Sequence, residues 1–311
     1  LYDIPNARLG VIRNGALERV DFPLSGKASE IAIGPGVTEV ILDPDHDFLR
    51  EIKGDYWAPT SLSHVARLAP NGVDRLAAAR RLIGRDPSDA SIDALVAGLR
   101  ADRSEFPAID ALDFLGTLRS PSLEAFFLEE LVGPSYDRRV AAASALAGLP
   151  RTPAIRSALA KAIRPEGDVR VVATAVTALA AESDPASVEA VRRASSIESR
   201  GGLIERAAFP VLVERSPSEA AKLLVDAAGK GGPIRRINAV NAMEKLPASL
   251  PAVTAALEKA ILDPRDRVAR SGAVVAAARG EKTLVPALVK RRASAEAGLA
   301  REIDGALAKL R

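Results

Sequence analysis

Apolar and polar positions repeat along most of the chain with a period of 31 to 33 residues. In each copy, a nine-residue segment carries a small residue at its fifth position and a larger apolar residue at its ninth, as in Ala175 and Leu179. This spacing puts both side chains on one face of a helix, where the small residue allows close helix packing. The eight copies are Asp74–Leu82, Pro107–Leu115, Arg138–Leu146, Val171–Leu179, Ile204–Leu212, Arg235–Met243, Arg267–Val275 and Leu299–Leu307.

A second pattern, offset from the first, is a capping residue followed by proline. This pair is typical of a helix N-cap and its first turn, and each pair opens an apolar stretch with helical spacing. Each period therefore predicts two helices. The pairs are Asp86-Pro87, Ser120-Pro121, Thr152-Pro153, Asp184-Pro185 and Ser216-Pro217.

Helix pairs of this length predict a mainly α fold, an α-α superhelix of about eight helical hairpins over residues 58–311. The pattern resembles HEAT repeats. The signatures of tetratricopeptide and ankyrin repeats, which have a similar period, are absent from the sequence.

Residues 1–53 predict a small antiparallel β segment. Asn14-Gly15 is a strong hairpin signal between the strand candidates Ala7–Arg13 and Ala16–Phe22. A glycine-rich turn separates two further candidates, Ala28–Ile33 and Val37–Leu42. Three or four strands bury too little surface to fold alone, so we expect them to pack on the helices or to end a larger β-sandwich.

Composition excludes several classes of chemistry. The chain has no Cys and two His, which leaves no disulfide framework, thiolate metal site or histidine zinc cluster. Its net charge of +3 is near balance, and no apolar stretch is long enough to span a bilayer, so we expect neither a nucleic-acid nor a membrane partner.

Residue 1 is Leu and the single Met is Met243, so we expect a fragment or a processed product. Localisation stays open, with the cytoplasm slightly favoured.

The β segment and its exit resemble a known family. Tyr2–Pro5, then Val40–Asp45 and Phe48–Ile52, followed by helical repeats, resemble the C-terminal region of M1-family zinc aminopeptidases and their bacterial relatives. The resemblance implies that 1–53 ends a β-sandwich and that 58–311 is a non-catalytic helical domain that shapes substrate access. Its partner would be an upstream catalytic domain, and zinc and a peptide substrate would belong to the parent enzyme.

The chain itself carries no zinc helix. Asn241-Ala242-Met243-Glu244 resembles the exopeptidase motif of that family, but Met243 is the apolar ninth position of the sixth repeat, which predicts a core residue. We therefore expect no catalytic residue, metal or cofactor in this chain, and leave open whether it belongs to an enzyme. The alternative is a free-standing HEAT-repeat scaffold that binds another protein.

Candidate contact residues lie at the fourth and seventh positions of the second helices, which should face the concave side. Thr174, Thr177, Asn238 and Asn241 are small or polar there and could contact a ligand or simply be solvated. The pair Tyr56 and Trp57 lies at the joint between strands and helices, where we expect it to pack the two parts together.

Arginines and aspartates recur near the starts of the second helices, as in Arg235, Arg236 and Asp266. We expect such pairs to bridge neighbouring repeats. The alternative, a basic track for nucleic acid, is weakened because no aromatic residue follows Phe209 to stack on bases. Asp43, Asp45 and Asp47 begin like a calcium loop, but the required Gly and Glu are missing, which favours a plain turn.

Overall fold

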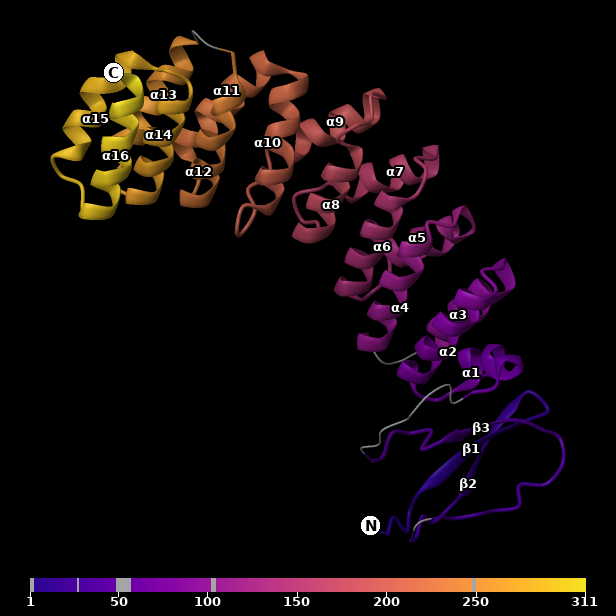
Figure 1. Cartoon of the computed structure of the whole chain (residues 1–311). Helices are drawn as coiled ribbons and strands as arrows, with labels where there is room; N and C mark the ends of the chain where they lie inside the picture. Colours follow the sequence, from indigo (N-terminus) through magenta and orange to yellow (C-terminus); the bar gives the residue numbers. More distant parts are fainter. Residues whose placement is uncertain (1–2, 27, 49–56, 102–104, 248–249) are drawn as a thin grey trace. The chain divides into compact units, whose positions relative to one another are not determined.

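The computed structural model describes residues 3–26, 28–48, 57–101, 105–247 and 250–311. The chain forms two compact units, Leu1–Leu149 and Pro150–Arg311, which we call unit 1 and unit 2. Unit 1 holds a small sheet and the first six α-helices, and unit 2 is entirely helical in its described residues (Figure 1). No helix among the described residues has both the length and the apolar character that crossing a membrane requires.

The sheet has three antiparallel strands in the order β2-β1-β3. Its strands are β1 (Arg8–Arg13), β2 (Ala16–Asp21) and β3 (Val37–Leu42). The predicted hairpin is confirmed: Asn14 and Gly15 both have positive φ, 50° and 78°, as a two-residue turn of the primed type requires. The sheet meets the first helices directly, because the Ser61 hydroxyl donates a 2.9 Å hydrogen bond to the carbonyl of Thr38 in β3.

The predicted strand over 28–33 does not form. That segment is irregular, and the carbonyl of Ile33 accepts a 2.6 Å hydrogen bond from the guanidinium of Arg13. The Pro35 carbonyl accepts another bond from the same guanidinium. The backbone is thus satisfied by a side chain of β1 rather than by a strand ladder.

Unit 1 continues with three helical hairpins. The first helices of these hairpins are α1 (Leu62–Leu68), α3 (Asp89–Ala101) and α5 (Glu124–Leu131). The second helices are α2 (Gly72–Arg85), α4 (Glu105–Leu118) and α6 (Tyr136–Gly148).

Unit 2 stacks five more hairpins in two rows. The first-helix row contains α7 (Pro153–Ala162), α9 (Pro185–Ala194), α11 (Pro217–Lys230), α13 (Pro251–Ile261) and α15 (Val285–Arg292). The second-helix row contains α8 (Val169–Leu179), α10 (Leu203–Arg215), α12 (Pro233–Ala242), α14 (Asp266–Ala278) and α16 (Ala297–Leu310), each packed against the next. The prediction of a mainly α, HEAT-like fold with eight hairpins and a small antiparallel sheet is confirmed.

All eight predicted nine-residue segments lie on second helices, the sixth ending in a short 3-10 turn at Met243–Lys245. The small residues Ala78, Ala111, Ala142, Ala175, Ala208 and Ala239 are all buried, as expected. The seventh repeat is displaced by one position: Ser271 is half-buried, and the close approach is made by Gly272. A Cβ on Gly272 would lie 2.8 Å from the backbone nitrogen of Ile261 in α13.

The predicted caps are confirmed in two repeats. The Thr152 hydroxyl accepts a hydrogen bond from the backbone of Ile155, and the Asp184 carboxylate accepts one from the backbone of Ser187. Ser216 precedes α11 without a side-chain bond to its backbone. The helix predicted to begin at Pro87 begins at Asp89 instead.

Candidate functional site

The outward side of the second-helix row in unit 2 is the part of the molecule on which the predicted contact residues lie. Each helix of this row buries one side against its neighbours and the first helices, and exposes the opposite side at positions i, i+3 or i+4, and i+7. We call this surface the second-helix face: Thr174 and Thr177 of α8; Leu203, Arg206 and Pro210 of α10; Ile234, Asn238 and Asn241 of α12; Arg267, Arg270 and Val274 of α14; and Arg301 of α16.

The four predicted contact residues fall into two separate pairs on this face. Thr174 and Thr177 lie one turn apart on α8, and Asn238 and Asn241 lie one turn apart on α12, with α10 between the two helices. The Thr177 hydroxyl donates to the carbonyl of Ala173 at 3.0 Å, within its own helix. The threonines and the asparagines therefore cannot contact one small ligand together.

Asn238 also has a structural partner. Its side-chain nitrogen donates a 3.2 Å hydrogen bond to the carbonyl of Gly202, which precedes α10. Gly202 has a φ of 70°, and a Cβ there would clash with Asn238 itself. Asn238 thus joins the middle of α12 to the start of α10, while Asn241 is exposed to solvent.

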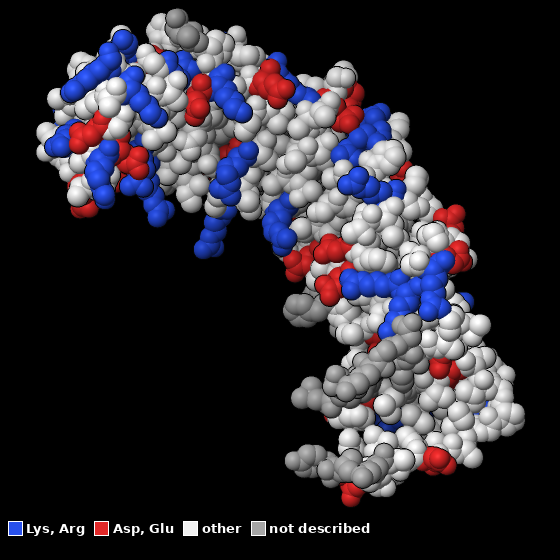
Figure 2. All heavy atoms as spheres, viewed as in Figure 1, with Lys and Arg blue, Asp and Glu red and all other residues white. Residues whose placement is uncertain are grey.

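The four predicted contact residues include no arginine, although arginines are also exposed on this face. Arg206, Arg267, Arg270 and Arg301 are exposed on this face, and in the described part of the chain none of them forms an ion pair with a carboxylate. Among the described residues, Arg206 and Arg301 bond only to backbone carbonyls, those of Gly201 and Ala297. In the space-filling view, basic side chains project from the margin of unit 2 where the second helices lie (Figure 2). Arg206 and Arg270 are two repeats apart in the sequence, and this spacing is the feature that could have identified them as candidates.

Aliphatic side chains lie among these arginines. Leu203 and Ile234, the exposed first residue of α10 and second residue of α12, are 38% and 45% exposed, and Val274 on α14 is 46% exposed. The Ile234 side chain approaches Gly202, the residue that directly precedes Leu203 in the chain. The second-helix face therefore combines exposed apolar groups with positive charge.

The predicted bridging of neighbouring repeats is confirmed for other arginines. Arg235 on α12 lies 3.6 Å from the buried carboxylate of Glu205 on α10 and donates to the carbonyls of Ile197 and Ser195. Arg236 pairs with buried Asp263, and burial lowers the pKa of this guanidinium. These arginines have full sets of partners and hold the stack together.

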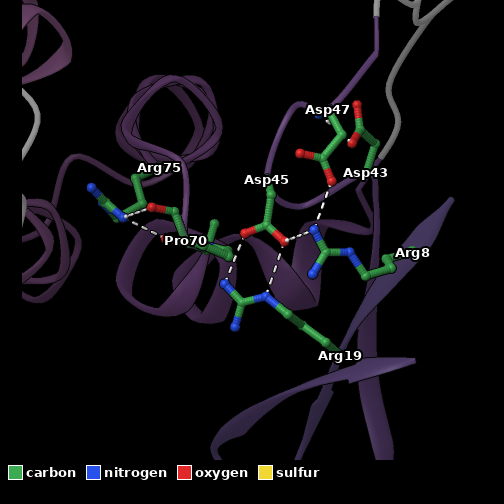
Figure 3. Close-up of polar contacts among 8 residues, drawn as sticks. Arg8, Arg19, Asp43, Asp45, Asp47, Pro70 and Arg75 are labelled. Carbon is green, nitrogen blue, oxygen red and sulfur yellow. Dashed lines mark hydrogen bonds and ion pairs between the residues drawn. The ribbon is translucent and has the colours of Figure 1, made fainter. Parts of the chain in front are cut away.

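The aspartate loop after β3 is a structural turn in unit 1 (Figure 3). Asp43 is buried, and its carboxylate accepts the backbone N–H of Asp47 at 2.7 Å. Asp45 accepts two hydrogen bonds from Arg19, 2.8 and 3.0 Å long, and these bonds lower the pKa of its carboxyl. Arg8 lies 3.3 Å from Asp45 and 2.7 Å from Asp47. Arginines therefore neutralise the carboxylates, and no cluster suited to a metal ion occurs among the described residues.

The same loop reaches the first helices. His46 lies 3.0 Å from the buried carboxylate of Asp74 on α2. Trp57, predicted to pack strands and helices together, is buried, with the guanidinium of Arg81 on α2 at 5.5 Å from its ring centre. Tyr56, its predicted companion, lies outside the described residues.

These features define a HEAT-like helical-repeat protein whose exposed second-helix face carries its candidate site. No family model matches the chain. No curated protein matches it either. Among solved structures, it is similar to YibA of Escherichia coli, with a TM-score of 0.49, 16% identity, and coverage of 78% of this chain and 98% of that one.

Two further solved structures are similar at lower scores. Human deoxyhypusine hydroxylase, solved in complex with glycerol, has a TM-score of 0.36 and 16% identity, with 81% of this chain and 95% of that chain covered. An engineered protein has a TM-score of 0.27 and 16% identity, with 80% and 96% covered. All three scores are below 0.5, so the likenesses carry no functional conclusion.

The resemblance to M1-family aminopeptidases is contradicted. No family model or curated relative supports it, and the solved structures named above are other HEAT-like helical proteins. The motif that suggested it has a local explanation, because Asp43 and Asp45 form a turn held by backbone N–H groups and arginines. The expectations of a parent peptidase and its zinc rested on that resemblance and are not carried further.

Proposed function

We propose that this chain is a scaffold that binds a protein partner on its second-helix face. The observation that carries the proposal is the exposure of Leu203, Ile234 and Val274 on a continuous row of packed helices, beside arginines that have no carboxylate partner in the described part of the chain. Exposed aliphatic groups that gather on one surface are typical of interaction sites.

The remaining residues of the face suit the same role. Thr174, Pro210 and Asn241 are short, so they leave room for the side chains of a partner. The threonine and asparagine groups offer hydrogen bonds, and arginine beside apolar groups is enriched at protein interfaces. The proposal assigns no catalytic activity to this chain.

Site-specific crosslinking tests the proposal. A photo-crosslinking amino acid is placed at Asn241 on α12 and, as a control, at Lys259, which is exposed on the first helix α13. We expect an adduct from the source lysate at position 241 and none at 259. The adduct is identified by mass spectrometry, and the partner is then produced pure for affinity measurements.

The pure partner allows a matched test of the apolar contact. Leu203→Glu with Ile234→Glu should weaken binding by at least about tenfold, because the variant replaces an apolar contact with charged groups that lose their hydration in the interface. Val289→Glu, on a side chain 55% exposed on α15 in the first-helix row, should leave the affinity unchanged. The proposal would be contradicted by equal adduct yields at positions 241 and 259. It would also be contradicted if the double variant bound the partner with unchanged affinity.

A further inference from the structure

On the first-helix row of unit 2, some exposed cations pair with carboxylates, whereas Lys222 and Lys259 form no ion pair among the described residues. On the first-helix row, Arg192 lies 2.6 Å from Glu189 and 3.5 Å from Glu219, and Lys230 lies 2.5 Å from Asp226. Each of these cations has a carboxylate within its own row. All four exposed arginines of the second-helix face have none among the described residues.

The arginines gather at one end of the face. Arg206, Arg270 and Arg301 each lie about one turn inside α10, α14 and α16, and Arg267 lies at the start of α14. Arg200 and Arg265, exposed in the loops that lead into α10 and α14, form no ion pair in the described residues either. Exposed carboxylates also occur on these helices and in the loops that precede them: Glu198, Glu214, Glu296, Glu302 and Asp304. Asp304 pairs with Arg292, and the partly exposed Asp266 pairs with Arg291, so neither compensates an arginine of the face. Positive charge therefore dominates this end.

The order of the groups across the helices is regular. From α10 to α14, the face presents Arg206, then the exposed Ile234 and the half-buried Asn238 on α12, then Arg270. Neighbouring helices pack roughly 8–10 Å apart. An extended chain rises about 3.3 Å per residue, so three of its residues cover one helix interval.

We propose that the partner segment is acidic and extended, with an aliphatic residue between two carboxylates that are about three residues away on either side. The aliphatic side chain lies over Ile234 and Leu203, and the carboxylates face Arg206 and Arg270. This inference rests on the proposed scaffold function and names the chemistry of its partner.

A protein segment fits this face better than a nucleic acid does. Arg206 and Arg270 lie on either side of the exposed Ile234, which an aliphatic side chain of a protein can cover and a charged phosphate backbone would leave in water. No residue after Phe209 is aromatic, and Phe209 itself is buried, so bases would have no ring on which to stack.

A synthetic peptide tests the inference directly on the full chain. The probe is a short fluorescein-labelled peptide with a central leucine, a glutamate three residues before it and three residues after it, and Ser and Gly elsewhere. The pattern reads the same in both chain directions, so the orientation of the bound segment need not be known. The comparison peptide carries glutamine in place of both glutamates.

We expect fluorescence polarisation to show that the glutamate peptide binds at least about fivefold more tightly at low salt, with the advantage shrinking as salt rises. Arg206→Ala with Arg270→Ala should abolish this advantage. Lys222→Ala with Lys259→Ala, which removes the same charge from exposed residues of the first-helix row, should preserve it. Circular dichroism shows that each variant is folded.

Two results would overturn the inference. One is equal affinity for the glutamate and glutamine peptides. The other is a single-stranded oligonucleotide of equal charge that binds more tightly than the glutamate peptide and displaces it, which would assign the face to nucleic acid. Either result leaves the crosslinking at Asn241 as a separate test, because a partner captured there by other contacts would still support the scaffold function.

Discussion

At the scale of single residues, arginine has two distinct roles in unit 2. Arg235 and Arg279 are surrounded by acceptors: Arg279 donates to the carbonyls of Met243 and Leu246 at 2.8 and 2.7 Å and pairs with Glu281. Such residues satisfy the carbonyl groups that helix ends leave without partners. Arg267 and Arg270 are exposed and have no comparable partners among the described residues. The first role stabilises the stack, and the second makes charge available for binding.

The pair between Arg236 and Asp263 gives a stability prediction. Asp263→Asn keeps the size of the side chain but leaves the half-buried guanidinium without a carboxylate, so we expect a loss of about 3 kcal/mol in the free energy of unfolding. Urea denaturation of the full chain measures it. Adding Arg236→Met should recover much of the loss, and a double variant no more stable than Asp263→Asn would contradict this account.

Asp45 gives a pH prediction for unit 1. Its pKa is lowered by hydrogen bonds from Arg19, so its contribution to stability is present above the ordinary carboxyl pKa and is lost as the pH falls through the lowered value. Asp45→Asn should therefore cost about 1 kcal/mol at neutral pH and almost nothing in strong acid. Urea denaturation at both pH values measures the difference. Asp21→Asn on β2, whose carboxylate has no ion pair among the described residues, should show no such change.

The sequence predicts residue types at these positions better than it predicts their partners. The alternation of Arg and Asp near the second helices indicated bridges between repeats, and Arg235 and Arg236 form them. The partner of Arg236 is Asp263, which lies in the loop between α13 and α14, and helical spacing does not predict the path of a loop. The exposed arginines of the face were missed as candidates, because exposure without a partner is a property of the packed stack.

At the scale of elements, the sequence period identified the second helix of all eight hairpins. In the seventh repeat, however, it placed the small contact residue one position too early. In the seventh repeat, Ser271 was expected at the close contact and Gly272 occupies it. Glycine and serine are both small, so the pattern could not separate them. The predicted strand over 28–33 failed for a different reason, since Arg13 supplies hydrogen bonds that a strand neighbour would otherwise provide.

The register of the seventh repeat is testable by two glycine substitutions. Gly272→Ala places a Cβ against the backbone of Ile261 and Ala260, so we expect a loss of about 1–3 kcal/mol in the free energy of unfolding. Gly305→Ala is the matched control inside α16, where nothing lies within 4 Å of the added group. It should stabilise the chain by about 0.5–1 kcal/mol, measured by the same urea titration. Equal effects of the two substitutions would contradict the register.

At the scale of the whole molecule, fold and function differ in how far the sequence reveals them. Eight copies of one pattern specify the helical stack, since each repeat packs mainly on its neighbours. A short motif such as Asp43 to Asp45 specifies only a turn, and the family inferred from it was wrong. The candidate face depends on which side chains remain exposed after five hairpins have packed, so its chemistry emerges only from the assembled unit.

The division into two units predicts that residues 150–311 fold alone. A continuous core runs from Phe209 to Leu310 entirely within unit 2, and repeat proteins gain their stability from contacts between adjacent repeats. We expect the separate fragment to be helical by circular dichroism and to unfold cooperatively in urea. Because every arginine of the second-helix face lies in it, the fragment should also bind the glutamate peptide as tightly as the full chain does. A fragment that becomes helical only when residues 1–149 are added would show that the two units form one cooperative structure. A folded fragment that fails to bind the glutamate peptide would indicate that unit 1 recognises the acidic segment.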